Sequence, residues 1–226
     1  MGIHANADCG FARSDFAHRF LVRKGLDLNA RVTPPQSAPI SAESDAHLIE
    51  TQISSEEVFK GKLLHVIRDQ VKLPNGNTSS REYIKHPGAS CIVAEFEEGK
   101  LLMLRQFRYA TGRVMIEFPA GKLDPKENPL VCAQRELKEE TGYWARSWHT
   151  LGDIHLAIGY SDEVIHVFHA NGLVQGEAMP DQDEFLEVFR ATPEEIEQMI
   201  RDNRITDAKT TSAFMRWQLL RRPGIV

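Results

Sequence analysis

Short runs of apolar positions between turn signals predict strands along most of the chain, with a few helices between them. A strand region begins near Val58, is marked by Leu63, Leu64, Val66, Val71 and Leu73, and ends at Pro74-Asn75-Gly76-Asn77. Asn-Gly between two apolar runs is a strong hairpin signal, so residues 81–85 are expected to form the returning strand. His86-Pro87-Gly88 then interrupts the pattern.

Six further segments have the composition of strands: 89–96, 101–107, 114–119, 148–156, 164–169 and 185–189. Only Glu97-Glu98-Gly99-Lys100 separates the first two segments. We therefore expect these two strands to form a second hairpin.

Three segments carry helix signals. Residues 129–141 have a helical period, and Gly142 is a typical C-terminal stop. The apolar face of this helix consists of Leu130, Ala133 and Leu137. Thr192-Pro193-Glu194-Glu195 is a capping box that opens a second helix, and Asp207 is expected to cap a third. Strands interspersed with a few helices predict an α+β (mixed α/β) fold, in which helices flank a mixed sheet.

The first part of the chain lacks a sustained period of either kind. It also contains a proline-rich stretch at residues 33–39. We expect a poorly ordered extension at residues 1–50, a strand region at 51–88 and the main domain at 89–226.

Charge and cysteine content exclude several classes of protein. The 226 residues include 27 Lys and Arg against 32 Asp and Glu, a formal net charge of -5, so no global basic field attracts nucleic acid or an anionic membrane. No apolar run approaches the ~18 residues of a membrane span. The three cysteines are Cys9, Cys91 and Cys132. Because their number is odd and no CxxC pair is present, the sequence does not suggest a disulfide framework, which favours a reducing, cytoplasmic location.

Three carboxylates on the helix at 129–141 are the main candidate for chemistry. Glu136, Glu139 and Glu140 stand at i, i+3 and i+4, so they project from one side of the helix. Like charges at this spacing repel one another, and their hard oxygens suit Mg²⁺, or alternatively Mn²⁺.

Neighbouring residues complete this candidate metal site. Arg135 precedes Glu139 by four residues and can hold its carboxylate in one rotamer. Gly121 lets the backbone approach the metal, so the main-chain carbonyl of Ala120 can supply a further oxygen ligand.

Residues 121–143 fill every position of the pattern G-x5-E-x7-R-E-U-x-E-E-x-G-U, where U is apolar. The chain therefore resembles the Nudix hydrolases. The resemblance implies a Nudix-type α/β/α sandwich with an added N-terminal antiparallel strand region. It also implies that water attacks a phosphorus of a nucleoside diphosphate linked to another group, with divalent cations neutralising the diphosphate.

Three further motifs resemble the ADP-ribose pyrophosphatase branch of that family: Arg81-Glu82 with His86-Pro87-Gly88, then residues 105–109, then residues 117–121. The resemblance implies a homodimer in which the strand region helps to form a shared substrate pocket. The substrate-binding residues that it implies are Arg81, Glu82, Arg108 and Glu117. Of these, the two arginines are expected near the diphosphate or ribose and Glu117 near the sugar.

The general base is expected in the loop that contains Gly159-Tyr160-Ser161-Asp162-Glu163. A carboxylate there would take the proton from the attacking water. We favour Glu163, while Asp162 and Glu184 remain alternatives. The catalytic set is thus Glu163, Arg135 and Glu139.

The sequence is best explained by Mg²⁺-dependent hydrolysis of ADP-ribose to AMP and ribose 5-phosphate. One alternative is a Nudix hydrolase of another nucleoside diphosphate sugar, such as GDP-mannose. A second is a sensor that binds ADP-ribose without cleaving it. RNA decapping is disfavoured, because the chain is acidic and has no basic stripe for nucleic acid.

Overall fold

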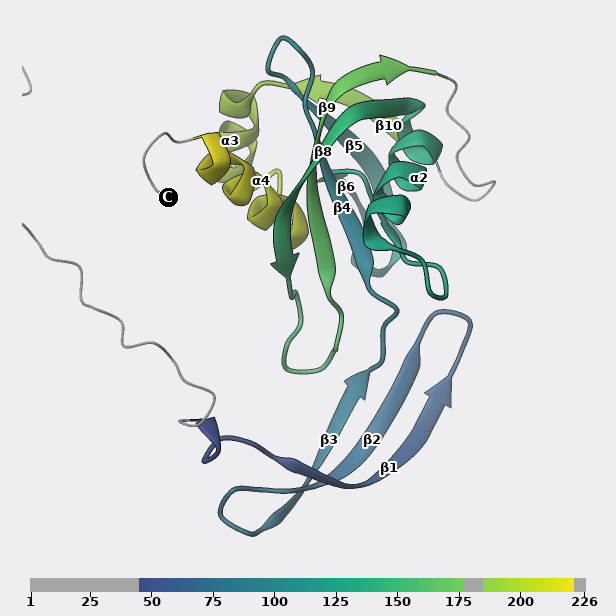
Figure 1. Cartoon of the computed structure of the whole chain (residues 1–226), viewed down its shortest axis with the longest axis vertical. Helices are drawn as coiled ribbons and strands as arrows, with labels where there is room; N and C mark the ends of the chain where they lie inside the picture. Colours follow the sequence, from purple (N-terminus) through teal and green to yellow (C-terminus); the bar gives the residue numbers. More distant parts are fainter. Residues whose placement is uncertain (1–44, 177–184, 222–226) are drawn as a thin grey trace, which may run out of the picture. The chain divides into compact units, whose positions relative to one another are not determined.

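A three-stranded antiparallel sheet forms the beginning of the described chain. The computed structural model describes residues 45–176 and 185–221. The sheet has the order β1 (Thr51–Lys60), β2 (His65–Lys72) and β3 (Thr78–Ile84) (Figure 1). The predicted turn between β2 and β3 is confirmed, since the amide of Leu73 donates to the carbonyl of Asn77 at 2.8 Å.

β1 was not predicted as a separate strand. Every one of its residues is exposed, so no buried face imposes a strict apolar and polar alternation on its sequence. Its pairing with β2 supplies the hydrogen bonds that make it a strand.

Two more sheets form the main domain. A four-stranded mixed sheet has the order β7 (Ala120–Lys122), β4 (Ala89–Ala94), β9 (Ile165–Gln175) and β8 (Tyr143–Ile154). In this sheet β4 and β9 are parallel and the other pairs antiparallel. An antiparallel sheet has the order β10 (Leu186–Ala191), β5 (Leu101–Arg108) and β6 (Arg113–Glu117), with a 3-10 turn (Tyr109–Thr111) between β5 and β6.

The expected hairpin of β4 and β5 is wrong. The two strands are joined by the predicted turn, but they belong to different sheets, and only an isolated bridge between Glu95 and Leu101 pairs them. Both strands are apolar on both faces, with every residue of β4 and the first four of β5 buried. A strand of this kind needs cover on both sides, which a two-stranded hairpin does not provide.

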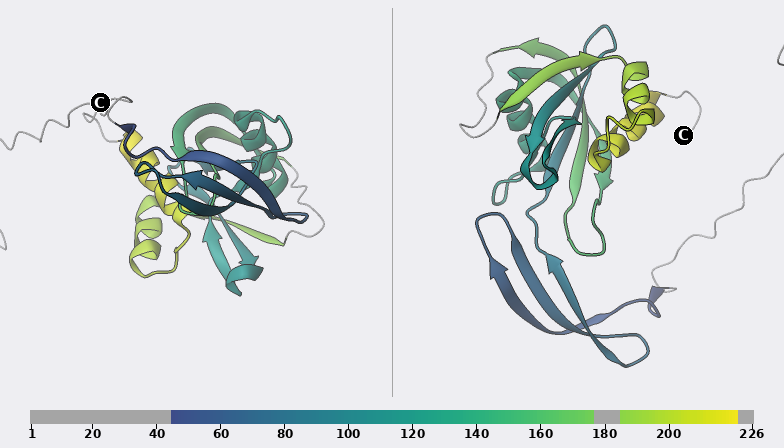
Figure 2. Two further views of the ribbon diagram at one scale, coloured as in Figure 1. Left: turned by 90° about the horizontal axis from the view of Figure 1, so that it is seen from below. Right: turned by 180° about the vertical axis from the view of Figure 1, so that it is seen from behind.

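Helices supply that cover on opposite sides. α2 (Pro129–Thr141) lies on one side of the strands, and α3 (Pro193–Arg201) and α4 (Ala208–Arg221) lie on the other (Figures 1 and 2). A hydrophobic core lies on each side of β4, and successive residues of the strand point into different cores. Ile92 packs with Leu137 of α2, whereas Val93 packs in the cluster that contains Trp217 of α4. The predicted α/β/α sandwich with a mixed sheet is confirmed.

Local signals set the helix ends as predicted. Gly142 ends α2 with a φ of 73°, a left-handed conformation that favours glycine, and its amide donates to the carbonyl of Lys138. Thr192 and Glu195 form the reciprocal capping box at the start of α3. No helix in the described ranges is long and apolar enough to cross a membrane.

Candidate active site

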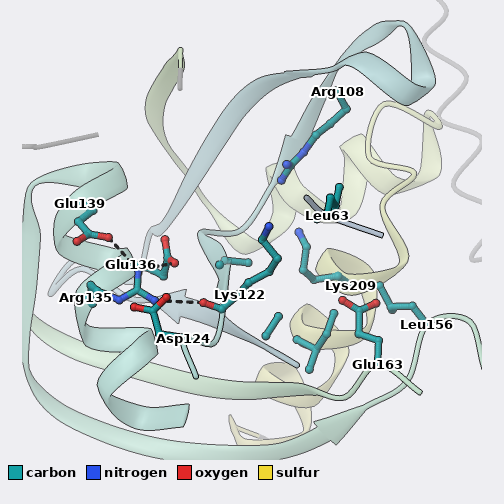
Figure 3. A pocket seen from close by; sticks show the side chains of 14 residues that line it. Leu63, Arg108, Lys122, Asp124, Arg135, Glu136, Glu139, Leu156, Glu163 and Lys209 are labelled. Atoms are coloured by element: carbon teal, nitrogen blue, oxygen red, sulfur yellow. Dashed lines mark hydrogen bonds and ion pairs between the residues drawn. The ribbon is translucent and has the colours of Figure 1, made fainter. Parts of the chain in front are cut away.

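A pocket of about 540 Å³ collects most of the predicted site residues (Figure 3). It is lined by parts of β4, β5, β7, α2 and α4, by the loop between β8 and β9 with the first residue of β9, and by Leu63 between β1 and β2. Its charged lining residues are Asp124, Glu136, Glu139, Glu163, Arg108, Lys122, Arg135 and Lys209. In Figure 3 the two α2 carboxylates lie on one side, while Arg108, Lys209 and Glu163 lie on the other.

The contact between β7 and α2 explains why position 121 is a glycine. A Cβ added to Gly121 would lie 1.9 Å from both Cδ and Oε1 of Glu136. Any side chain at this position would therefore displace the Glu136 carboxylate. The absence of a side chain lets the backbone of β7 and the carboxylate of Glu136 share one small space.

Arg135 organises the acidic side of the pocket. Its Nη1 donates to Glu136 at 2.8 Å and to Glu139 at 3.0 Å, so the predicted contact with Glu139 is present. Its Nε and Nη2 also donate to the two carboxylate oxygens of Glu127, each at 3.0 Å. These hydrogen bonds lower the pKa of Glu127 to about 2, and the same partners raise the pKa of Arg135.

Glu140 is buried, with 5% of its surface exposed, and it faces β7. Its Oε2 accepts a hydrogen bond from the amide of Ala120 at 3.1 Å. Glu136 and Glu140 thus contact β7 at Gly121 and Ala120, while Glu139 is linked to Glu136 through Arg135. Within residues 45–176 and 185–221, no three Asp, Glu, His or Cys side chains converge as a metal-binding group. Arg135 donates to both Glu136 and Glu139.

The donor set nevertheless suits a hard divalent cation. Carboxylate oxygens of Glu136 and Glu139 line the same pocket as Ala120, and the missing side chain at Gly121 leaves room for the Glu136 carboxylate. Magnesium and manganese prefer oxygen ligands of this kind.

A partly buried ion-pair network forms the basic side. Arg108 donates to both oxygens of Glu117, at 2.8 and 2.9 Å, and Lys209 Nζ donates to Glu117 at 2.9 Å and to Asp207 at 2.8 Å. Burial acts to raise the pKa of Glu117, but hydrogen bonds and charges from Arg108 and Lys209 outweigh it and hold that pKa below its ordinary value. Asp207 also caps α4, as predicted, by accepting from the amide of Thr210 at 3.0 Å.

Lys209 was missed by the sequence reasoning. Only 8% of the surface of Lys209 is exposed, yet this residue lines the pocket. The only sequence signal is a lysine two residues after the capping Asp207, and a lysine in a first helical turn is usually solvated. Its partner Glu117 is 92 residues away in the chain, so their contact depends on the tertiary fold.

Among the candidate bases, Glu163 lines the pocket. Its Oε1 lies 3.5 Å from Nδ1 of His86. Asp162 instead accepts a hydrogen bond from the amide of His86 at 2.7 Å and is not among the lining residues. Glu184 lies outside the described residues.

Arg81 and Glu82 do not reach this pocket within one chain. Nε of Arg81 donates to Glu50 at 2.9 Å, and Glu82 accepts from Nε of Arg68 at 2.8 Å. Both residues lie on β3, in the N-terminal sheet. Their predicted role in binding substrate therefore depends on a second copy of the chain.

Comparison with known proteins identifies the family. Residues 84–215 match the model of the NUDIX domain. The chain belongs to the Nudix family. Residues 50–84 of this Nudix hydrolase also match the nucleoside diphosphate sugar hydrolase N-terminal domain, which corresponds to β1–β3.

Two bacterial relatives align with most of this Nudix hydrolase. It is 40% identical over 174 residues to a Bacillus subtilis protein named ADP-ribose pyrophosphatase, an alignment that covers 76% of this chain and 94% of the relative. It is 41% identical over 172 residues to the methanol dehydrogenase activator of Bacillus methanolicus, covering 75% and 93%. A crystal structure of an ADP compounds hydrolase aligns with a TM-score of 0.68 at 22% identity, covering 76% of this chain and 95% of that one, and so shares the fold.

Proposed function

We propose that this Nudix hydrolase cleaves the diphosphate bond of ADP-ribose to give AMP and ribose 5-phosphate. The observation that carries the proposal is a pocket with carboxylates on one side and Arg108 and Lys209 on the other. A diphosphate can be held there between bound cations and guanidinium or ammonium donors. The relative from Bacillus subtilis, which is named for this substrate, supports the choice.

In this proposal Glu136, Glu139, Glu140 and the carbonyl of Ala120 hold divalent cations, Mg²⁺ or alternatively Mn²⁺. The bound cations would neutralise charge on the diphosphate and lower the pKa of a bound water. Arg135 positions the carboxylates. Its hydrogen bonds to Glu136 and Glu139 keep both side chains at the pocket wall.

Glu163 is the proposed general base. It lines the pocket, and the only ionic partner within 4 Å in the described chain is His86, which becomes charged only when it is protonated. A carboxylate in this place can accept the proton of the attacking water, a contribution of roughly a hundredfold or more when it is well positioned. Arg108 is proposed to contact the diphosphate. Glu117 is proposed to lie near the sugar and to hold Arg108 in position through the two hydrogen bonds that it accepts.

We further propose a homodimer built through the N-terminal sheet. All residues of β1 are exposed, including the apolar side chains Ile53, Val58 and Phe59 at 56%, 42% and 54%. A second copy would cover these side chains. It would also give Arg81 and Glu82 a route to a shared substrate pocket.

The segments at 51–88 and 89–226 would then serve as the dimerisation region and the catalytic domain, after an extension at residues 1–50. The net charge of -5 favours a small nucleotide substrate over nucleic acid, and the cysteine content favours a cytoplasmic location.

The test is mass analysis of products after incubation with ADP-ribose and Mg²⁺ in ¹⁸O water. AMP and ribose 5-phosphate, one of them carrying the label, are expected. A higher kcat/KM for GDP-mannose in parallel assays would replace ADP-ribose with the other nucleotide sugar. Binding of ADP-ribose without turnover would instead indicate a sensor.

A further inference from the structure

A second pocket, of about 340 Å³, lies between the β1–β2 turn, the end of β3 with the loop after it, and β7. No Asp or Glu of the described chain lines it. Its ionisable lining residues are Lys60, Lys62, Lys85, Lys122, His65 and His86. Four lysines in one concave surface are unexpected in a chain with a net charge of -5.

Three of the four lysines have no carboxylate within ion-pair distance among the described residues. Lys60 lies 3.8 Å from Glu57, which also accepts from His65. In the ranges that the structure describes, Lys62, Lys85 and Lys122 form no ion pair. Positive charges that share a small pocket repel one another, which raises the electrostatic energy of the empty pocket. An anion bound among the lysines would replace this repulsion with attraction.

Backbone hydrogen bonds hold the walls of this pocket in place. The amide of Gly61 donates to the carbonyl of Leu64 at 2.8 Å, which closes a turn that follows Lys60 and contains Lys62. The amide of Lys85 donates to the carbonyl of His65, also at 2.8 Å. The lysines are therefore presented by fixed backbone, so that little ordering is needed when an anion binds.

This second pocket, named the lysine pocket for Lys60, Lys62, Lys85 and Lys122, adjoins the candidate active site. Leu63 and Lys122 line both pockets. We propose that the lysine pocket binds a phosphate group in addition to the diphosphate that is cleaved. Lysine is a compact ammonium charge with three donors, and several together match the oxygens of a phosphomonoester dianion.

This phosphate is either carried on the substrate or free in solution. The first case rests on the proposed function, because the substrate would then be a nucleoside diphosphate sugar with an extra phosphomonoester. An extended polyanion fits less well, since the site is a small concavity on an acidic chain.

Titration calorimetry with inorganic phosphate tests the site directly, in EDTA and at constant ionic strength. The Lys62→Met/Lys85→Met variant should bind about tenfold or more weakly than wild type, because each hydrogen bond between charged groups contributes on the order of tenfold. Lys72→Met/Lys100→Met makes the same charge change at exposed lysines outside both pockets and should bind like wild type. Equal weakening in both variants, or no binding to wild type, would overturn the proposal.

Kinetics distinguish the source of the phosphate. The kcat/KM of wild type is compared for ADP-ribose and for ADP-ribose carrying one additional phosphate on a ribose. A preference for the phosphorylated compound that disappears in Lys62→Met/Lys85→Met assigns the phosphate to the substrate. Phosphate binding without such a preference assigns the pocket to free phosphate.

The same experiments separate this proposal from the proposed function. Wild type that cleaves ADP-ribose but binds no phosphate would refute the lysine pocket alone. Wild type that binds phosphate through Lys62 and Lys85 but cleaves no ADP-ribose would refute the proposed function and leave the pocket standing.

Discussion

Replacing Lys209 with methionine should destabilise the protein strongly, because it removes the ammonium that bridges the buried carboxylate of Glu117 and the part-buried carboxylate of Asp207. Lys209 Nζ donates to Glu117 and Asp207 at 2.9 and 2.8 Å. Breaking a buried ion pair costs about 3–5 kcal/mol. Here the cost is reduced, because Glu117 keeps both hydrogen bonds from Arg108, and Asp207 keeps those from the amide and hydroxyl of Thr210.

We therefore expect a loss of about 2–3 kcal/mol in the free energy of unfolding at pH 7. For a domain of this size each kcal/mol lowers Tm by roughly 2–4 °C, so Tm should fall by roughly 5–10 °C. Calorimetric or circular dichroism melts measure this change. Lys100→Met, at an exposed turn position, is the control and should remain within about 1 °C.

The pH dependence gives a second measurement of the same network. The pKa of Glu117 is depressed in the folded state, so its contribution is present above the unfolded value of about 4.3 and is lost as pH falls through the folded pKa. The pKa of Lys209 is raised, so its contribution is present below about pH 10.4 and is lost at still higher pH. The Tm difference between wild type and Lys209→Met should therefore be full at pH 7 and shrink below about pH 4.

Combining Lys209→Met with Glu117→Gln completes a double-mutant cycle. The two effects should be less than additive, because the second change neutralises the carboxylate that the first one leaves undersatisfied. A Tm for Lys209→Met equal to that of wild type at pH 7, or fully additive effects, would show that the bridge does not stabilise the fold.

Four substitutions test the acidic side and the base. Gly121→Ala should lower kcat by about tenfold or more with little change in Tm, because the new methyl displaces the flexible Glu136 carboxylate. Glu140→Gln should lower Mg²⁺-dependent kcat about a hundredfold with a small change in Tm, since the amide oxygen can keep the backbone hydrogen bond that the carboxylate accepts. Glu163→Gln should lower kcat about a hundredfold and Asp162→Asn less than tenfold.

Matched measurements control these variants. Gly159→Ala places its methyl in open space, with no atom within 4 Å, and should change neither Tm nor kcat. Turnover like that of wild type in Glu140→Gln would contradict the metal assignment. A larger loss in Asp162→Asn than in Glu163→Gln would transfer the role of base to Asp162.

Local signals in the amino-acid sequence were sufficient to predict several elements. The bounds of α2 were predicted correctly, because Pro129, Gly142 and a helical apolar period all act within a few residues. The carboxylates of α2 were predicted on one side for the same reason, since their spacing along a helix sets their direction. The motif that fills residues 121–143 then led to the family.

The partners of these elements, in contrast, depend on how the whole chain packs. Strands β4 and β5 are neighbours in sequence, yet each pairs in a different sheet, because two helical layers cover both of their faces. Tertiary packing likewise brings Lys209 of α4 to Glu117 of β6, and Lys122 of β7 to the pocket that contains Lys62. Side chains so distant in the chain meet only after the sheets and helices have packed, and no local pattern of residues encodes that contact.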